Sequence, residues 1–383
     1  MPVEVAAPAP TTTMEITVSK AELLRELTAT QGVVERKTTI PILSNYLFEA
    51  AGDKLSLTAT DLDLSLRTSC NAKVKKEGAC TIPARKLYDY VRLLPDADIT
   101  IKLLENHWVS IRCGRSNTKM VGMARSNFPG LPVFPAAGVI KISAPVLRSM
   151  IAKTGFAIAN EESRYTLNGA LMVLKPESIT MVATDGHRLA HIERSGEKFD
   201  GVSGEMKTLI PKKAMDELKS LLDSDIEFID FAKDESTLFF RVGPRLLTSR
   251  QLTGQFPNYE AVLPKEITKS IMLESDELGG AISRVAQFAD ERSRAVRLRL
   301  DKGELKLSAS STETGESEDS LEVEYNGDPM AIGFNAQYLL DFIKAVGAGE
   351  VKLELKDAQS AGQLRPAESE DYKYRYIVMP MRI

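Results

Sequence analysis

Apolar and polar side chains alternate along the chain in two recurring patterns. Segments such as 55–60 ("LSLTAT") and 179–184 ("ITMVAT") alternate with a period of two, as expected for strands that bury one face. Between them, segments such as 81–94 ("TIPARKLYDYVRLL") place apolar residues three or four apart, as expected for amphipathic helices. We therefore predict an α+β fold in which the helices cover one face of antiparallel sheets.

The same order of segments occurs three times. Segments 128–135 ("FPGLPVFP") and 256–264 ("FPNYEAVLP") are related by a shift of 128 positions. The segment at 81–94 has counterparts at 209–222 ("LIPKKAMDELKSLL") and 331–346 ("AIGFNAQYLLDFIKAV"), each a strand end followed by a helical pattern. This periodicity predicts three similar domains, covering residues 14–137, 138–264 and 265–383.

Each domain divides again into two halves. When 17–33 ("TVSKAELLRELTATQGV") is laid over 81–96, Val18 falls on Ile82 and Leu23 on Leu87. We predict that each half is one helix followed by several antiparallel strands. Residues 1–13 are rich in Pro, Ala and Thr and hold few large apolar side chains, so we predict a disordered leader there.

Composition narrows the functional classes. Contents of 43% hydrophobic and 27% charged residues are typical of a soluble globular protein, and no apolar run suggests a membrane segment, so we expect a cytoplasmic protein without a membrane partner. The three cysteines form no C-x-x-C pair, which argues against a disulfide framework or a zinc knuckle. A net charge of -4 argues against a broadly basic nucleic-acid-binding surface but allows a local basic stripe.

The predicted helices provide such a stripe. Basic residues recur in their first turns or on their polar faces: Lys20, Arg25, Arg85, Lys86, Arg92, Arg148, Lys153, Lys212, Lys213 and Lys219. On any single helix such residues are ordinarily a solvated face. Their recurrence in successive repeats suggests that they converge on one partner.

The segment 183–191 ("ATDGHRLAH") raises the possibility of a metal site, because His187 and His191 are four residues apart. On a helix this spacing suits zinc, but the segment follows an alternating strand and a Thr-Asp-Gly turn. In a strand these residues are roughly 13 Å apart, too far to share one ion. We therefore interpret Thr184-Asp185 as a structural turn, as in the matching "TD" at Asp61, and the rest as a local departure from the repeat.

Taken together, three repeats containing "TIPARK", "MVATDGHRLA" and "IGFN", followed by a terminal "YIVMPMRI", resemble the bacterial β sliding clamp family of DNA polymerase III over residues 14–383. The resemblance implies a head-to-tail homodimer closed into a ring of six clamp domains around duplex DNA, with no catalytic activity and no cofactor. It further implies that the replicative polymerase, the clamp loader and repair proteins dock through short linear peptides.

The resemblance also assigns residues to three surfaces. The implied peptide pocket consists of Arg164, Leu167, Thr184, Gly186, His187, Arg188, Leu189, Pro257, Val262, Asn335, Tyr338, Ile377, Met379, Pro380, Met381 and Arg382, in which Arg188 and Arg382 would orient polar atoms of the peptide. The implied DNA contacts are Arg36, Lys37, Arg85, Lys86, Tyr165, Lys212 and Lys213. Met120 and Phe288 would lie at the dimer interface. The acidic run 313–324 is ordinarily a solvated loop and strand face, with contact to Arg112 and Arg115 of a neighbouring subunit as the alternative.

Some positions depart from the family pattern. Thr166, Ala261 and Ala361 stand where the family often has an aromatic residue, an arginine and a serine, so the peptide preference does not transfer. Two other functional classes remain as alternatives, a metal-dependent hydrolase built around His187 and His191, and a monomeric peptide-binding scaffold that does not act on DNA.

Overall fold

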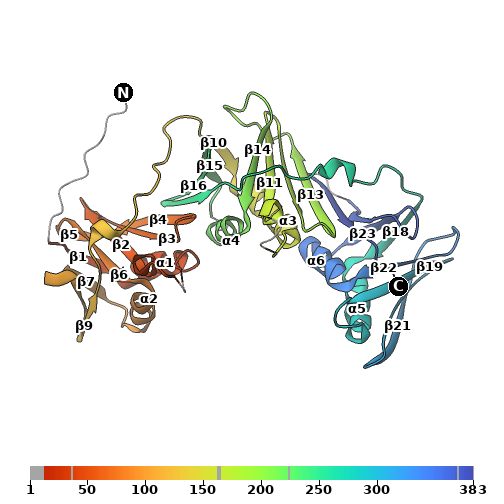
Figure 1. Cartoon of the computed structure of the whole chain (residues 1–383), viewed down its shortest axis with the longest axis horizontal. Helices are drawn as coiled ribbons and strands as arrows, with labels where there is room; N and C mark the ends of the chain where they lie inside the picture. Colours follow the sequence, from red (N-terminus) through yellow and green to blue (C-terminus); the bar gives the residue numbers. More distant parts are fainter. Residues whose placement is uncertain (1–12, 36–37, 162–164, 223–224, 369–370, 383) are drawn as a thin grey trace. The chain divides into compact units, whose positions relative to one another are not determined.

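The computed structural model describes residues 13–35, 38–161, 165–222, 225–368 and 371–382 (Figure 1). In this part of the chain no helix is long and apolar enough to span a membrane. Its α-helices are α1 (Lys20–Ala29), α2 (Ala84–Leu93), α3 (Ala144–Thr154), α4 (Lys212–Leu221), α5 (Ser275–Val285) and α6 (Ala336–Val346). The predicted leader lies mostly outside the described residues.

Each helix follows one strand and precedes three, which confirms the predicted half-repeat of one helix and several strands. The strands of the first repeat are β1 (Glu15–Ser19), β2 (Asn45–Ala51), β3 (Lys54–Thr60), β4 (Leu64–Asn71), β5 (Lys73–Lys76), β6 (Gly78–Pro83), β7 (Asp98–Leu103), β8 (Trp108–Cys113) and β9 (Ser116–Val121). Only β5 is additional to the half-repeat pattern. Those of the second repeat are β10 (Ile140–Ser143), β11 (Gly169–Lys175), β12 (Ser178–Thr184), β13 (Arg188–Ser195), β14 (Met206–Pro211), β15 (Phe228–Lys233), β16 (Thr237–Val242) and β17 (Arg245–Arg250). The third repeat contains β18 (Lys269–Glu274), β19 (Ala295–Asp301), β20 (Glu304–Ser311), β21 (Gly315–Glu322), β22 (Met330–Asn335), β23 (Glu350–Leu355), β24 (Gly362–Pro366) and β25 (Lys373–Val378).

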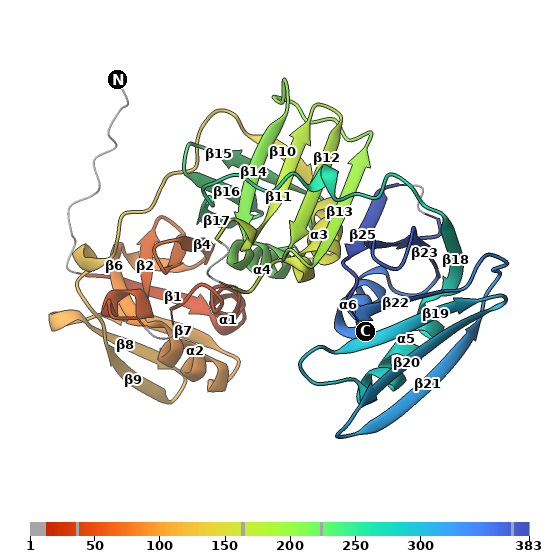
Figure 2. The same ribbon diagram turned by 45° about the vertical axis from the view of Figure 1, so that its right-hand side comes forward.

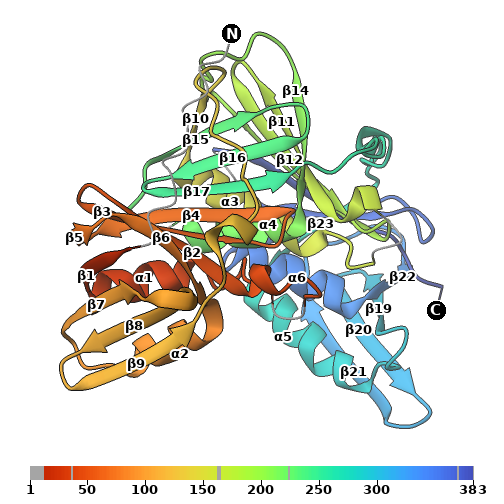
Figure 3. The same cartoon turned by 60° about the vertical axis from the view of Figure 1, so that its left-hand side comes forward.

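The helices form where the apolar spacing predicts them. In α1, Ser19 caps the N-terminus by accepting a hydrogen bond from the backbone N–H of Glu22 at 3.2 Å, while Leu23 and Leu27 are buried. In α2 the matching residues Leu87 and Val91 are buried. Helices α1 and α2 pack against each other, as do α5 and α6 (Figures 2 and 3). Each pair therefore buries its apolar stripes against its own sheets.

The named strands form four antiparallel sheets in the orders β5-β1-β7-β8-β9, β10-β15-β16-β17-β4-β3-β2-β6, β14-β11-β12-β13-β25-β24-β23-β18 and β21-β20-β19-β22. Two of these sheets cross from one repeat to the next. Strand β4 of the first repeat pairs with β17 of the second, and Figure 3 shows these strands side by side. Strand β13 of the second repeat pairs with β25 of the third. Both junctions follow one rule. The third strand after a repeat's first helix (β4 or β13) pairs with the third strand after the next repeat's second helix (β17 or β25).

Contacts group the described residues into two units. One comprises residues within Met1–Pro145 and Asp216–Arg250, and the other comprises residues within Val146–Met215 and Gln251–Ile383. The second repeat is thus shared between the units, because each of its half-sheets continues into a neighbouring repeat. Grouping by contacts therefore follows sheet continuity, whereas the predicted domains follow the sequence repeat.

Candidate functional site

The turn after β12 begins the candidate site. The Thr184 hydroxyl donates to the Arg188 carbonyl at 2.6 Å, and the Asp185 carboxylate accepts from the backbone N–H groups of His187 and Arg188 at 2.9 and 3.0 Å. The matching turn after β3 is built in the same way, since Thr60 donates to the Leu64 carbonyl at 3.0 Å and Asp61 accepts from two backbone N–H groups. This repetition supports the interpretation of Thr184-Asp185 as a structural turn.

The third residue of each turn has a left-handed backbone. Gly186 has φ 89°, and its counterpart Leu62 has φ 84°. Glycine adopts this conformation without strain, whereas leucine does so at a cost. The second repeat thus has an open, unstrained turn that exposes backbone where the first repeat has a side chain.

The two histidines lie in different environments. His187 lies in the exposed turn before β13, and His191 lies within β13, where its ring packs 5.6 Å from the Tyr259 ring. Burial lowers the pKa of His191, and its Nδ1 atom has no hydrogen-bond partner in the described structure. The segment is therefore a turn and a strand, as predicted, and the helical geometry on which a shared metal would depend does not occur.

A cavity of about 110 Å³ lies beside this turn and is almost entirely apolar. It brings together Leu167, the turn, the segment 257–262 and the end of β25. Its lining residues are Leu167, Thr184, Gly186, Arg188, Leu189, Pro257, Tyr259, Val262, Ile377 and Met379. Every one of these except Tyr259 belongs to the set that the resemblance assigned to the peptide pocket. Residues from distant parts of the chain thus meet at one cavity.

Met379 lies at the mouth of this cavity, just after β25. The backbone N–H of Met379 donates a hydrogen bond to the His187 carbonyl at 2.9 Å. Met379 is 39% exposed. The preceding Ile377 and Val378 are buried, so the last strand is both a core strand and a cavity wall. A flexible, partly exposed thioether beside an apolar cavity is suited to adapt to different bound side chains.

The guanidinium of Arg188 is bonded within the chain. It donates to Asp185 at 3.0 Å, to Asp341 of α6 at 2.5 Å and to the Phe156 carbonyl at 2.5 Å. It also lies 4.4 Å from the centre of the Tyr338 ring, and its side chain is only 10% exposed. Because these bonds engage all three guanidinium nitrogens, Arg188 braces the cavity wall instead of offering a free fork to a peptide.

The other residues assigned to the pocket do not line this cavity. Asn335 caps α6, Tyr338 packs under Arg188, and the N–H of Met381 donates to the Gly333 carbonyl at 2.8 Å. Pro380 is half-buried, and His187 and Arg382 are exposed. Arg164 lies outside the described residues. Tyr259 is not among the predicted pocket residues, although it lies in the motif "FPNYEAVLP".

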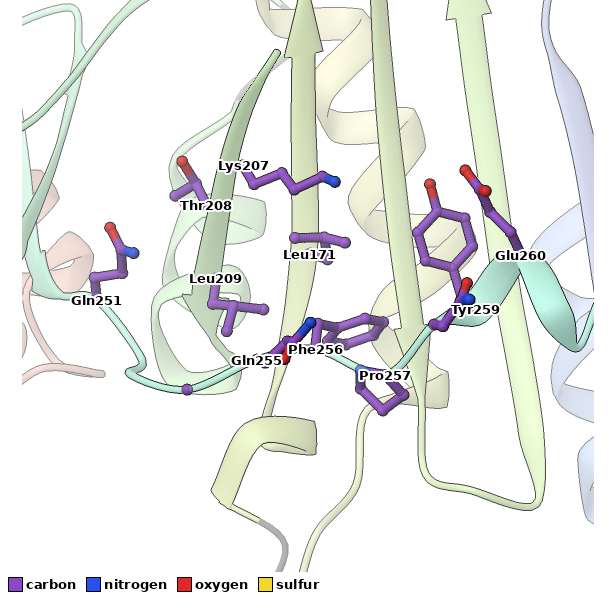
Figure 4. Close-up of a pocket in the computed structure, with 12 residues that line it drawn as sticks. Leu171, Lys207, Thr208, Leu209, Gln251, Gln255, Phe256, Pro257, Tyr259 and Glu260 are labelled. Carbon is purple, nitrogen blue, oxygen red and sulfur yellow. The ribbon is translucent and has the colours of Figure 1, made fainter.

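A second, larger pocket of about 420 Å³ adjoins the cavity and shares Pro257 and Tyr259 with it. Figure 4 shows it between the strands β11 and β14 and the segment that follows β17. Its lining residues are Leu171, Lys207, Thr208, Leu209, Gln251, Gly254, Gln255, Phe256, Pro257, Asn258, Tyr259 and Glu260. No pattern in the sequence predicts this pocket.

The predicted DNA contacts lie at helix starts where the structure describes them. Arg85 and Lys86 are exposed at the start of α2, and Lys213 is exposed at the start of α4. Tyr165 is 55% exposed. Lys212 is half-buried and donates to the Asn160 side chain. Arg36 and Lys37 lie outside the described residues.

The two residues predicted for a dimer interface lie beside sheet edges. Met120 is half-buried on β9, and Phe288 ends the short helix η7 (Ala286–Phe288), which contacts β21. Both β9 and β21 are terminal strands of their sheets. Unpaired strand edges of this kind are ready to pair with another chain.

Comparison with family models gives matches along almost the whole chain. The N-terminal, central and C-terminal domains of the DNA polymerase III beta subunit match residues 14–132, 141–258 and 260–382.

Individual proteins give the same result. The chain is 35% identical over 376 residues to the beta sliding clamp of Caulobacter vibrioides, covering 97% of this chain and 100% of that protein. It is 36% identical over 374 residues to that of Pseudomonas putida, with the same coverage.

Among solved structures, it is similar to sliding clamps from Pseudomonas aeruginosa (TM-score 0.90, 34% identity) and Bartonella birtlesii (TM-score 0.92, 33% identity), both bound to griselimycin. Each comparison covers 97% of this chain and 100% of the other.

Proposed function

We propose the function of this protein from its family: the chain belongs to the DNA polymerase III beta subunit family, the bacterial beta sliding clamps. It is therefore a non-catalytic clamp that confers processivity on a DNA polymerase. The domains of this clamp correspond to residues 14–137, 138–264 and 265–383, which lie close to the three matched segments. The protein acts in the cytoplasm.

The observation that carries the specific proposal is the apolar cavity of about 110 Å³ between the turn 184–189, the segment 257–262 and Met379. It takes an apolar side chain of a short peptide carried by a polymerase or a repair protein. Burial of one large apolar side chain contributes about 1.5–3 kcal/mol, which is one part of the binding free energy of a peptide and leaves it exchangeable. Exchange is what a clamp serving several partners requires.

Ring closure follows from the strand order. Across both internal junctions, the last strand of one repeat's first half pairs with the last strand of the next repeat's second half. Continuing this rule, β21 of one copy pairs with β9 of another, because these are the two such strands that have no partner at one edge within the described chain. The result is a heterologous contact that closes when two copies supply six domains.

Charge supports the same pairing. Strand β21 carries Glu316 and Glu322, together with Asp319 and Glu318, which pair with Arg284 and Lys306 within the chain. Strand β9 carries Lys119 and lies beside Arg112 and Arg115. Opposite charges on the two edges favour the head-to-tail contact and disfavour like edges meeting.

Duplex DNA is bound without reading its sequence. The cations at the starts of α2 and α4 contact phosphates, which carry no base information. Contacts of this kind are weak and replaceable, so a ring held by topology slides along the duplex even though the chain has a net charge of -4.

The docking proposal is tested by shortening the C-terminus. Deletion of residues 379–383 removes Met379 from the cavity mouth, and we expect it to weaken binding of a polymerase-tail peptide at least about tenfold, measured by fluorescence anisotropy. The control is Met272→Ala, which changes a methionine of similar exposure on β18 away from the cavity. Dimer mass by light scattering stays unchanged in both variants. Normal peptide affinity in the deletion would show that the peptide docks elsewhere.

A further inference from the structure

We infer that His191 and Arg375 are positioning residues for the apolar cavity, because together they hold segment 257–264 against the sheet. This segment extends the cavity-lining segment 257–262 to Pro264. The inference rests on the proposed docking function and assigns two further residues to the same site. Three residues of the segment line the cavity, so any movement of the segment changes the shape of the cavity.

His191 and Arg375 form one row on the sheet, next to the cavity. They are direct partners in the register of β13 and β25, and direct partners in antiparallel strands point to the same face. Leu189 and Ile377, two positions along the same strands, are also direct partners, and both line the cavity. Side chains two positions apart on a strand share a face, so the row of His191 and Arg375 lies beside the cavity on its own side of the sheet.

The His191 ring contacts the segment near its start. It packs 5.6 Å from the Tyr259 ring with 34° between the ring planes, and Figure 4 shows the Tyr259 ring over the sheet. His191 is buried, and its Nδ1 atom has no hydrogen-bond partner in the described structure. Because Nδ1 bonds nothing there, we attribute the hold on Tyr259 to ring packing.

The Arg375 guanidinium contacts the end of the segment. One of its terminal nitrogens donates to the Pro264 carbonyl at 3.1 Å, and its Nε donates to the Gln363 side chain at 2.6 Å. Gln363 in turn donates to Glu354 at 2.5 Å, and both of these side chains are buried. Two buried side chains thus fix the direction in which the guanidinium faces Pro264. Val262, which lines the cavity, lies in the sequence between the two held points.

The first junction has neither contact. The 124-residue shift that relates the two Thr-Asp turns places Arg67 on His191, and the register partner of Arg67 is Leu246. The Arg67 guanidinium donates to Glu49 of β2 at 2.9 Å, and its side chain is exposed. A leucine side chain has no donor for a backbone carbonyl. The two contacts therefore belong to the junction that holds the cavity and are not a general consequence of the repeat.

The test measures peptide affinity in the full-length protein. His191→Ala removes the ring, and Arg375→Met removes the hydrogen bonds but keeps an aliphatic stem. We expect each change to weaken binding of a polymerase-tail peptide about threefold to tenfold in fluorescence anisotropy, because the segment is then held at one point instead of two. His191→Phe keeps a ring and should bind within about twofold of the wild type. Arg194→Met is the control, because it makes the same change on β13 at an arginine that pairs with Glu197 away from the cavity.

Amide hydrogen exchange, measured without peptide, distinguishes positioning from a general loss of stability. We expect His191→Ala and Arg375→Met to speed exchange within 257–264 while leaving it unchanged in β11 and α6, because only the segment is released. His191→Phe and Arg194→Met should exchange like the wild type throughout.

The outcomes separate the two proposals. Normal peptide affinity in both His191→Ala and Arg375→Met overturns the positioning inference and leaves peptide docking intact. Weakened binding with unchanged exchange in 257–264, or with exchange raised equally throughout the sheet, also overturns it. Failure of the wild-type protein to bind the peptide overturns the docking function and this inference with it.

Discussion

Arg188 lines the cavity and also holds the turn 184–189 in place through bonds within the chain. Its guanidinium donates hydrogen bonds to Asp185 in the turn, to Asp341 of α6 and to the backbone carbonyl of Phe156. Arg188 thus connects the turn to α6 and to the segment around Phe156. Planar guanidinium groups fix such geometry because their donors point in set directions. Arg188 therefore sets the position of the turn that forms the cavity wall.

We predict that Arg188→Lys weakens peptide docking about tenfold, or about 1.4 kcal/mol, because a lysine ammonium cannot hold all three acceptors in place. The loss should be the same for peptides with and without polar side chains next to the apolar anchor, as a double-mutant cycle would measure. Arg194→Lys serves as control, because it makes the same change on β13 at an arginine that pairs with Glu197 away from the cavity. A loss limited to peptides with polar side chains would instead show that Arg188 contacts the peptide.

At the scale of elements, Glu26 links α1 to strand β17 of the second repeat through an ion pair. Its side chain is 1% exposed and accepts hydrogen bonds from Arg245 of β17 at 2.9 and 3.1 Å and from Thr68 of β4 at 2.5 Å. Burial alone would raise the pKa of Glu26, but bonds from Arg245, Thr68 and Arg25 lower it below its ordinary value. The carboxylate thus strengthens the junction between β4 and β17 when ionised.

We predict that Glu26→Gln lowers the free energy of unfolding by about 2–4 kcal/mol at pH 7, because it leaves Arg245 without its anionic partner. Since the folded pKa lies below the unfolded one, this contribution is complete above the ordinary carboxyl range near pH ~4.3 and is lost as the pH falls through the folded pKa. The difference between wild type and variant in urea unfolding should therefore shrink below that range. A difference independent of pH would contradict the charged bridge.

At the scale of the whole molecule, the proposed ring makes a prediction about topology. A closed ring is retained on circular DNA because it has no end to leave from, whereas it slides off linear DNA. We expect protein loaded by its clamp loader to remain on nicked circular plasmid during gel filtration and to be lost when the plasmid is cut once. Equal retention on both forms would favour ordinary electrostatic binding.

Much of this organisation was predictable from the sequence. The three repeats, the half-repeat of one helix and several strands, and the Thr-Asp turns are all confirmed, because their hydrogen bonds and apolar periods involve neighbouring residues. The cavity lining was predicted through family resemblance, with Tyr259 missed. The apolar pattern alone does not indicate that Leu167, Pro257 and Ile377 meet.

The tertiary structure alone decided the rest. Glu26 and Arg245 are 219 positions apart and Arg188 and Asp341 are 153 apart, so no local pattern could pair them. Pairing of β4 with β17 and of β13 with β25 likewise depends on which strand edges meet after folding. The larger pocket arises from a chain segment crossing a sheet face. The sequence by itself determined the repeating elements and their turns, since these depend on short-range geometry, whereas the cavity, its brace and the strand edges left for a second copy required long-range packing.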